Sequence, residues 1–301
     1  MSEAGSSNVE GASRRQLKDF VEFPPRNLSK AEPLAKLMQT CLYSGKDILL
    51  VRHYAPPIPK EEVLDVSSIA GVVRVVGRVE KQDDNPTGMA RIRCQGFRFE
   101  GLARVVFENV WIDAEAHGIS LYDDAQVEVI DSVIHSRGCG VQLFHAAGAI
   151  LRGAEVSDSL KDGIRAWCSA TLAMEGCKVG RNVGHGLFVA TSGKVIIDAC
   201  TFTGNRECGV RIHGTKVTRS SCTAKECVCV GNRHGLKVDS GAGCAWWGGQ
   251  VADNVREDVK VEDPSLVDSD LGIRRFCGII IPDLFAPAAP SPGEAPTRRQ
   301  G

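Results

Sequence analysis

Aromatic side chains recur in this sequence at a nearly constant spacing. Tyr122, Phe144 and Trp167 each follow a glycine by four residues, and Phe188 follows its glycine by two. Rings at the same place in successive structural units form a row, and a row of exposed rings can bind an extended ligand by stacking. Aromatic residues make up only 6% of the chain, so this row is a candidate binding surface. The alternative is that the rings only pack, because aromatic pairs also stabilise sheets without a ligand.

Basic side chains accompany the aromatic ones. Arg165, Arg211 and Lys237 follow their glycines by two residues, and His213 follows its glycine by four. Guanidinium and ammonium groups bind carboxylates through charge-assisted hydrogen bonds. We therefore expect an extended, acidic ligand, either a glycan or a protein segment. The predicted ligand-binding residues are Tyr122, Phe144, Trp167, Phe188, Arg165, Arg211, His213 and Lys237.

Candidates for acid and base catalysis are weaker. A glycoside hydrolase ordinarily needs two carboxylates about 5 to 9.5 Å apart, and Asp239 and Glu262 are the pair at a suitable spacing. They stand beside lysines, where surface ion pairs are the simpler explanation. A lyase or epimerase needs a base instead, and the candidates for that role are Arg165, Arg211 and His213.

A further column, directly before each glycine, contains only side chains that can bind metals. Cysteine and histidine neighbours in this column could hold a soft metal. Histidine before a turn glycine is more often solvated or hydrogen bonded to the backbone, so we expect no metal and no cofactor. The residues of this column are His117, Cys139, Asp162, His185, Cys208, His234 and Glu257.

A repeat of about 23 residues positions all these side chains. Glycine followed by two alternating aliphatic residues recurs with steps of 22, 23, 23, 23, 26 and 23 residues. Alternation with a period of two is typical of a strand with one buried face. The copies begin at Gly118, Gly140, Gly163, Gly186, Gly209 and Gly235, with a degenerate copy at Asp258.

Each repeat contains two further short apolar segments. The first four glycines are followed by alternating pairs such as Val127 and Val129, and then by single apolar residues such as Ile134. Three strands in 23 residues leave no room for a helix, and a four-stranded propeller blade needs about 40 to 45 residues. The sequence therefore predicts an all-β fold, a three-sided parallel β-helix whose rungs stack about 4.8 Å apart.

Small residues occupy one column of the repeat. A sharp bend inside a narrow solenoid leaves little volume, so this column is predicted to line an interior corner, with its cysteines acting as small hydrophobic residues. The column contains Ser132, Ala154, Cys177 and Cys200, with Asn109, Cys227 and Gly249 at the expected place in less regular rungs.

The repeats resemble the right-handed parallel β-helix repeats of the pectin-lyase-like superfamily. The resemblance covers residues 34–262 and includes the opening segments SGKDILLVRHYAPP and MARIRCQGFRFEGLARVVFENVWID. It implies a right-handed coil, but that superfamily contains enzymes, adhesins and binding domains alike. The family's calcium-binding carboxylate clusters and the Asp-Pro-His-containing motif of alginate epimerases are absent from this sequence, which disfavours catalysis.

The flanks differ from the repeats. Residues 1–27 are predicted to form a disordered tail, residues 28–282 the β-helix with its caps, and residues 283–301 a second tail rich in Pro and Ala. Regular rungs are expected over residues 91–262. Leu34–Tyr43 reads as a helix that caps the first rung, and Leu271–Ile281 as a cap on the last rung. The residues after Gly214 in the 26-residue repeat (TKVTRSSCTA) are expected to protrude as a loop.

Composition limits the remaining possibilities. The chain has 36 basic and 37 acidic residues, so no overall charge favours nucleic acid or an anionic membrane. Without a signal peptide or a long apolar run, we expect a cytoplasmic or else nuclear monomer whose 12 cysteines are reduced thiols. The expected function is a non-catalytic intracellular binding or scaffold module; the alternative is a lyase or epimerase that acts on uronate-containing polysaccharides.

Overall fold

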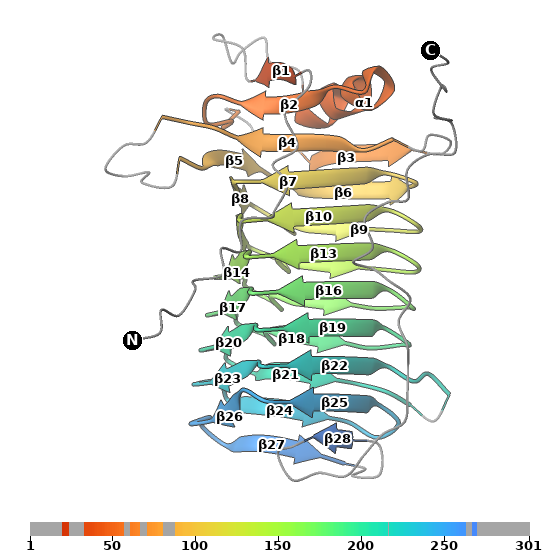
Figure 1. Ribbon diagram of the computed structural model, residues 1–301, viewed down its shortest axis with the longest axis vertical. Coiled ribbons are helices and arrows are strands. Elements are labelled where there is room, and N and C mark those ends of the chain that lie inside the picture. The colour runs from red at the N-terminus through yellow and green to blue at the C-terminus, as the bar shows by residue number, and fades with distance from the viewer. Residues whose placement is uncertain are drawn as a thin grey trace, which may run out of the picture.

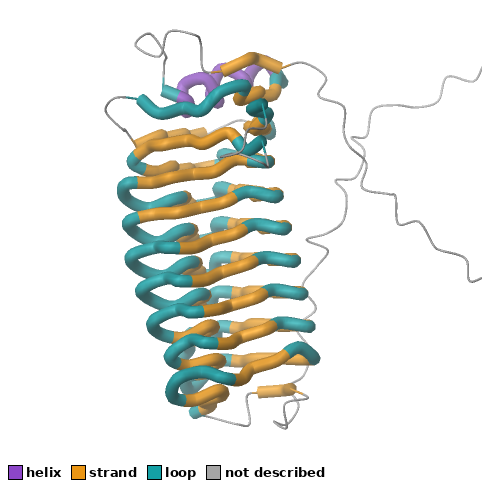
Figure 2. The backbone as a smooth tube through the Cα atoms, turned by 90° about the vertical axis from the view of Figure 1, so that its left-hand side faces the viewer, coloured by secondary structure: helices purple, strands orange, loops and turns teal. Residues whose placement is uncertain are grey.

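The chain coils into a solenoid with three parallel sheets, as the computed structural model shows (Figure 1). The structure describes residues 20–23, 33–56, 61–66, 71–80, 88–215, 217–262 and 267–269. In Figure 2 the successive rungs stack along one axis, with a single helix at the N-terminal end. The prediction of an all-β, right-handed parallel β-helix is confirmed.

The three sheets are named A, B and C in the order in which the chain visits them within a rung. Sheet A contains β1 (Phe20–Phe23), β2 (Asp47–Leu50), β4 (Val73–Gly77), β7 (Arg104–Glu108), β10 (Gln126–Ile130), β13 (Gly148–Arg152), β16 (Thr171–Glu175), β19 (Lys194–Asp198), β22 (Ser221–Lys225), β25 (Gly243–Trp247) and β28 (Val267–Ser269). Sheet B contains β5 (Ala90–Cys94), β8 (Val110–Ala114), β11 (Val133–Ser136), β14 (Glu155–Ser157), β17 (Lys178–Gly180), β20 (Thr201–Thr203), β23 (Val228–Val230) and β26 (Gln250–Ala252). Sheet C contains β3 (Glu61–Val66), β6 (Gly96–Gly101), β9 (Ile119–Leu121), β12 (Val141–Leu143), β15 (Ile164–Ala166), β18 (Leu187–Val189), β21 (Cys208–Ile212), β24 (His234–Val238) and β27 (Glu257–Val261).

The core is a set of aliphatic ladders inside the coil. The two aliphatic columns of the repeat are the inward positions of sheet C, where Ile119, Val141 and Ile164 pair in register and are fully buried. Because side chains alternate across a strand, the residues between them point outward. This alternation places the candidate binding residues on the outer face of sheet C.

The corner between sheets A and B has the predicted small residues. Ser132, Ala154, Cys177 and Cys200 are buried there, and the residue before each has a positive φ, as in Asp131 at 44°. The assignment of Asn109 to this column was wrong by one position: Val110 pairs with the small column, and Asn109 has the positive φ of 53°. The pattern of residue types alone did not show which of the two residues takes the left-handed corner.

A ladder of asparagines lies at the corner between sheets B and C. The Oδ1 atom of Asn205 accepts hydrogen bonds from the backbone N–H (3.2 Å) and Nδ2 (2.9 Å) of Asn182. Asn232 Oδ1 accepts the same two hydrogen bonds from Asn205, at 3.0 and 2.8 Å, and Asn254 Oδ1 accepts them from Asn232. These side chains satisfy backbone groups that lie outside the strand ladders.

Helix α1 (Leu34–Ser44) covers the first rung, as predicted. It packs on β2, β3 and β4, and it ends at Gly45, whose φ is 66°. The buried Glu62 on β3 accepts hydrogen bonds from the backbone N–H of Ala35 (2.7 Å) and the hydroxyl of Tyr54 (3.0 Å). This carboxylate fixes the N-terminus of the helix to sheet C, an interaction that sequence patterns did not reveal.

Two predicted boundaries differ from the structure. Phe20–Phe23, assigned to the N-terminal tail, form β1 and pair with β2. In the 26-residue repeat the connection is shorter than expected, because Ser221–Lys225 form β22 and the exposed part centres on Val217, which is 91% exposed. The rest of the two predicted tails, and the predicted cap at Leu271–Ile281, lie outside the described residues. No helix of the described chain is long and apolar enough to cross a membrane.

Candidate ligand-binding face

The four predicted aromatic residues form one continuous row on the outer face of sheet C. Ring centroids are 5.1 Å apart between Tyr122 and Phe144, 6.0 Å between Phe144 and Trp167, and 6.4 Å between Trp167 and Phe188. His213 extends the row, with its ring 6.5 Å from that of Phe188. We call these five residues the aromatic ridge. All five are half-buried, so the rings support one another and still present a surface to solvent.

The backbone fixes the ridge in register. Tyr122, Phe144 and Trp167 directly follow β9, β12 and β15, and the backbone N–H of each donates to the preceding rung. The N–H of Tyr122 donates to the carbonyl of Phe99 at 2.9 Å, and the N–H of Phe144 donates to the carbonyl of Leu121 at 2.9 Å. The rings therefore repeat with the rung spacing and need no ligand to order them.

Guanidinium groups lie over the rings of the ridge. The guanidinium carbon of Arg165 is 5.1 Å from the ring centroid of Trp167 and 5.7 Å from that of Phe188. Arg211 lies 5.5 Å from the Phe188 ring, and Arg98, which the sequence analysis did not select, lies 5.1 Å from the Tyr122 ring. These distances are within the range of cation–π attraction.

Carboxylates compensate much of the positive charge that the sequence predicted here. Arg165 donates to Asp162 Oδ2 from Nε at 2.9 Å and from Nη2 at 2.5 Å. Asp162 belongs to the column assigned to possible metal ligands, and the structure turns it toward the arginine instead. Arg98 forms an ion pair with Glu100. Around Tyr122, Phe144 and Trp167 the face is therefore almost neutral.

The other end of the ridge is a cluster of cations around Asp239. Oδ2 of Asp239 accepts hydrogen bonds from Arg211 (3.1 and 2.9 Å), and His213 Nδ1 lies 2.8 Å from it. Lys237 Nζ lies 3.0 Å from Oδ1. The Asp239 side chain is 6% exposed and that of His213 is 43% exposed, so the cations face the solvent. With a neutral imidazole this cluster keeps one excess positive charge.

The ionisation of Asp239 follows from these contacts. Burial by itself raises the pKa of the carboxyl group, but the hydrogen bonds from His213, Lys237 and Arg211 outweigh that effect and lower the pKa. Glu262 is held by the turn after β24, because its Oε2 accepts from the backbone N–H (3.0 Å) and hydroxyl (2.9 Å) of Ser240.

The column directly before the glycines connects rungs through hydrogen bonds. His117 Nδ1 accepts from the backbone N–H of Cys139 at 3.0 Å, and His185 Nδ1 accepts from that of Cys208 at 3.1 Å. Asp162 Oδ1 likewise accepts a hydrogen bond from the backbone N–H of His185 at 2.8 Å. Burial lowers the pKa of both imidazoles, and burial raises the pKa of the Cys139 and Cys208 thiols.

At the end of the same column an imidazole contacts a carboxylate. His234 Nδ1 lies 3.3 Å from Glu257 Oε2. Within the described ranges, no group of three or more His, Cys, Asp or Glu side chains has a geometry that could hold a metal ion. The eleven cysteines that the structure describes are unpaired, and Cys168 alone among these eleven is not fully buried.

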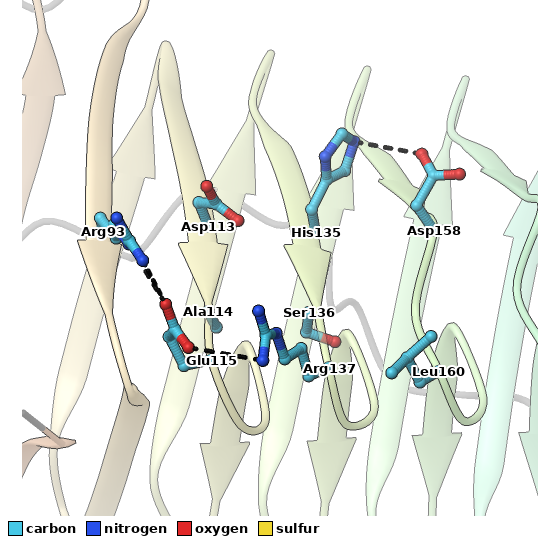
Figure 3. A pocket seen from close by; sticks show the side chains of 9 residues that line it. All are labelled: Arg93, Asp113, Ala114, Glu115, His135, Ser136, Arg137, Asp158 and Leu160. Carbon is cyan, nitrogen blue, oxygen red and sulfur yellow. Dashed lines mark hydrogen bonds and ion pairs between the residues drawn. The ribbon is translucent and has the colours of Figure 1, made fainter. Parts of the chain in front are cut away.

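The sequence pattern did not reveal a hollow of about 310 Å³ on the outer face of sheet B (Figure 3). Its lining comes from β5, β8, β11 and the turns that follow β8, β11 and β14, so four rungs contribute. These side chains recur with the same steps of 22 and 23 residues as those of sheet C, as in Asp113, His135 and Asp158, but their columns were not chosen as candidates. The lining residues are Arg93, Asp113, Ala114, Glu115, His135, Ser136, Arg137, Asp158 and Leu160.

Ser157, His135 and Asp158 lie together at this hollow but do not form a nucleophile and base relay. Ser157 Oγ is 3.0 Å and Asp158 Oδ2 is 3.6 Å from the same imidazole nitrogen, Nε2 of His135. A relay needs the serine and the carboxylate on different ring nitrogens. Ser157 is also buried, so a substrate does not reach it.

The fold and the repeat identify the family. Residues 95–255 match the family model described as right handed beta helix region, which is more than half of the chain. The protein belongs to this family of right-handed β-helix proteins. It is a solenoid with a row of aromatic rings on the outer face of sheet C.

Other similarities are distant. The chain is 24% identical over 152 residues to the aspartate carbamoyltransferase catalytic subunit of Synechococcus sp. (strain JA-3-3Ab), which is 50% of this chain and 42% of that protein. The corresponding protein of Synechococcus sp. (strain CC9902) is 23% identical over 152 residues, 50% of this chain and 39% of that protein. The chain thus spans about two fifths of the length of these curated relatives.

Solved structures with a similar backbone share little sequence. Pectate lyase Pel9A is 13% identical, with a TM-score of 0.47 and coverage of 76% of this chain and 72% of that chain. The Agl-KA catalytic domain is 11% identical, with a TM-score of 0.38 and coverage of 76% and 47%. Tailspike protein 2 of Escherichia coli O157:H7 bacteriophage CAB120 is 10% identical, with a TM-score of 0.36 and coverage of 74% and 43%.

Proposed function

We propose that this protein is a non-catalytic, intracellular binding module and that the aromatic ridge on sheet C holds an extended acidic glycan. The observation that carries the proposal is the unbroken row of five rings, Tyr122 to His213, with guanidinium groups over its faces. Sugar rings stack on aromatic side chains, while their hydroxyl groups need donors and acceptors close by. The ion pairs of Arg165 and Asp162 supply both.

The type of surface favours a glycan over a protein segment. An extended peptide commonly gains affinity by adding a strand to a free sheet edge. The ridge lies in the middle of a nine-stranded sheet, where β9, β12, β15 and β18 already pair on both sides. Side chains alone therefore contact the ligand, and flat rings with fixed polar neighbours suit a chain of sugars.

Charge along the ridge indicates where acidic groups of the glycan bind. Arg165 is balanced by Asp162, whereas Arg211 and Lys237 together face the single carboxylate of Asp239. Sugar acids therefore gain most at the Asp239 cluster, and neutral sugars suffice near Phe144. A glycan that binds this face therefore needs fewer acidic groups than one that binds the uniformly basic face expected from the sequence.

Substitution of Trp167 by Ala tests the proposal. Because Trp167 lies in the centre of the ridge, we expect the substitution to weaken binding of acidic oligosaccharides by about 30-fold or more, the effect of removing a 2 kcal/mol hot spot. Because the side chain is half-buried, the free energy of unfolding should fall by less than about 2 kcal/mol. Calorimetric titration with oligouronates of defined length, and thermal melting, measure the two effects.

Trp247, which is 42% exposed on sheet A, provides the matched control. Trp247→Ala removes an exposed indole away from the ridge and should leave binding unchanged. If oligouronates do not bind the folded wild-type protein, the glycan proposal is wrong; binding of acidic peptides in the same titration would point to a protein partner.

A second candidate function rests on the contact between His213 and Asp239. The carboxylate holds Nδ1 of an imidazole that is partly exposed, with Arg211 beside it. An oriented imidazole next to a guanidinium could remove a proton from a uronate in a lyase or epimerase reaction. Incubation with polyuronates should then produce unsaturated ends that absorb ultraviolet light, and His213→Gln should abolish them.

A further inference from the structure

The hollow on sheet B is separate from the aromatic ridge and has charges of opposite sign on its two sides. On one side the carboxylate of Glu115 is shared by Arg93, at 2.6 Å, and Arg137, at 3.8 Å. On the other side the guanidinium of Arg181 is shared by Glu155, at 3.2 Å, and Asp158, at 2.8 Å. The first side therefore has one excess positive charge, and the second side has one excess negative charge.

Arg137 is the group that remains most available on the positive side. Its side chain is 70% exposed, and its contact with Glu115 is long, because Arg93 already holds that carboxylate with two hydrogen bonds. Figure 3 shows Glu115 and Arg137 along one side of the hollow and Asp113 and His135 along the other. Asp113 is paired with Arg91 outside the hollow, so it adds no net charge.

The hydrogen bonds of Ser157 determine where the proton of His135 lies. The Ser157 hydroxyl donates to Glu155 Oε1 at 3.0 Å and accepts from Arg181 Nη2 at 3.2 Å. A hydroxyl has one proton to donate, so its contact with His135 Nε2 at 3.0 Å must be a hydrogen bond that the imidazole donates. In the neutral ring Nδ1 then has the free lone pair. No hydrogen bond joins Nδ1 to another residue in the described part of the chain.

We propose that this hollow binds a small zwitterion, specifically an α-amino acid with a short apolar side chain. Its carboxylate pairs with Arg137, and its ammonium group donates to His135 Nδ1 on the side where negative charge is in excess. The exposed side chain of Leu160 at the end of the hollow contacts the apolar part of the ligand. A volume of about 310 Å³ is at the lower end of the range for small-molecule sites, as an amino acid requires.

Matched ligands test the need for both charges. Isothermal titration of the full-length protein compares an amino acid such as valine with its N-acetyl derivative, which lacks the ammonium group, and with its amide, which lacks the carboxylate. We expect valine to bind and each derivative to bind at least about tenfold more weakly, the effect of losing one charge-assisted hydrogen bond. Equal binding of all three compounds, or no binding of a panel of apolar amino acids, would overturn the proposal.

Matched variants place the ligand in the hollow. Arg137→Gln should weaken amino acid binding at least about tenfold without loss of thermal stability, because Arg137 is largely exposed and weakly paired. Lys194→Gln changes an exposed cation on β19 of sheet A, away from the hollow, and should leave binding unchanged. The indole of Trp111 lies edge-on to His135, with ring centroids 5.1 Å apart, so its fluorescence should respond to the ligand. Unchanged amino acid binding in Arg137→Gln would show that any such binding occurs elsewhere.

Discussion

Histidine side chains act as hydrogen-bond acceptors between the rungs of this solenoid. His117 and His185 each accept a backbone N–H from the next rung through Nδ1. Only the neutral ring can accept, and burial lowers the pKa of both imidazoles, which keeps them neutral. Asp162 Oδ1 accepts the backbone N–H of His185 in the same way, so three rungs use this position as a hydrogen-bond acceptor.

Stability should therefore decrease when the pH falls below the ordinary histidine pKa of about 6.5. In the unfolded chain His117 and His185 then bind protons, whereas in the folded protein their lowered pKa values keep them neutral. The unfolded state binds more protons, so the free energy of unfolding falls with pH until it passes the folded-state pKa values. Urea unfolding at a series of pH values between 7.5 and about 5 measures this slope.

His185→Asn provides the control for this slope. Asparagine Oδ1 can accept the N–H of Cys208, as the equally short Asp162 side chain does for the neighbouring rung, but it does not titrate. The variant should fold with a smaller loss of stability on acidification than the wild type. A slope that the substitution leaves unchanged would show that other groups cause the acid sensitivity.

At the level of elements, the turns between sheets B and C determine how well consecutive rungs fit. Strands β17, β20 and β23 of sheet B are three residues long, and beyond them Asn182, Asn205 and Asn232 replace strand pairing with side-chain hydrogen bonds. Asn205 and Asn232 each accept two hydrogen bonds from the preceding rung, and Asn182 accepts one, from the backbone N–H of Ser159. These side chains are fully buried, so water cannot take over their partners.

Asn205→Ala should destabilise the solenoid by about 3 kcal/mol. The substitution leaves the backbone N–H of Asn182 without an acceptor, takes one of two acceptors from Asn182 Nδ2, and removes the donor to the carbonyl of Val179. Each buried group without a partner costs about 1 to 3 kcal/mol. Chemical unfolding of the variant measures the loss. Asn254→Ala, in a half-buried position, should cost less because water reaches it; equal losses would contradict this explanation.

For the whole molecule, stability depends on neighbours along one axis. Within the described ranges each strand pairs with strands of the rung before and the rung after it, as in other repeat proteins. At the N-terminal end α1 covers the first rung. The hydrogen bond from the backbone N–H of Ala35 to the carboxylate of Glu62 fixes the helix there. At the other end β26 and β27 are edge strands in the described chain, and the inward residues Val259 and Val261 are only half-buried.

Hydrogen exchange should therefore vary along the solenoid. Amides of β13, β16 and β19 have paired strands on both sides and should exchange slowest, while amides of β26 and β27 should exchange at least about tenfold faster. Mass spectrometry of proteolytic peptides after exchange in deuterated buffer measures the profile. Equal protection of the last rung and the central rungs would mean that the C-terminal end is covered as completely as the N-terminal end.

The periodicity of the sequence was sufficient to predict the coil and the row of rings. A repeat of about 23 residues with a period of two inside each strand determines which side chains point outward, so Tyr122, Phe144 and Trp167 had to align. The small corner column followed for the same reason, except at Asn109, where the backbone conformation decided the register. The asparagine ladder was not predicted, because its hydrogen bonds depend on the geometry of the turns.

The tertiary structure decided the electrostatics, because the spacing of the repeat shows which residues lie in adjacent rungs but not which of them form ion pairs. Asp239 lies 26 residues after His213, in the same column of the next rung, and 28 residues after Arg211, and it binds both, which leaves the cluster with only a small excess of charge. The hollow on sheet B depends on four rungs, and the ion pairs within it determine which of its charges remain free. The sequence thus determined the fold and the face that the rings occupy, since both follow from strand alternation. Which charges remain free to bind a ligand was decided by side-chain conformations in three dimensions.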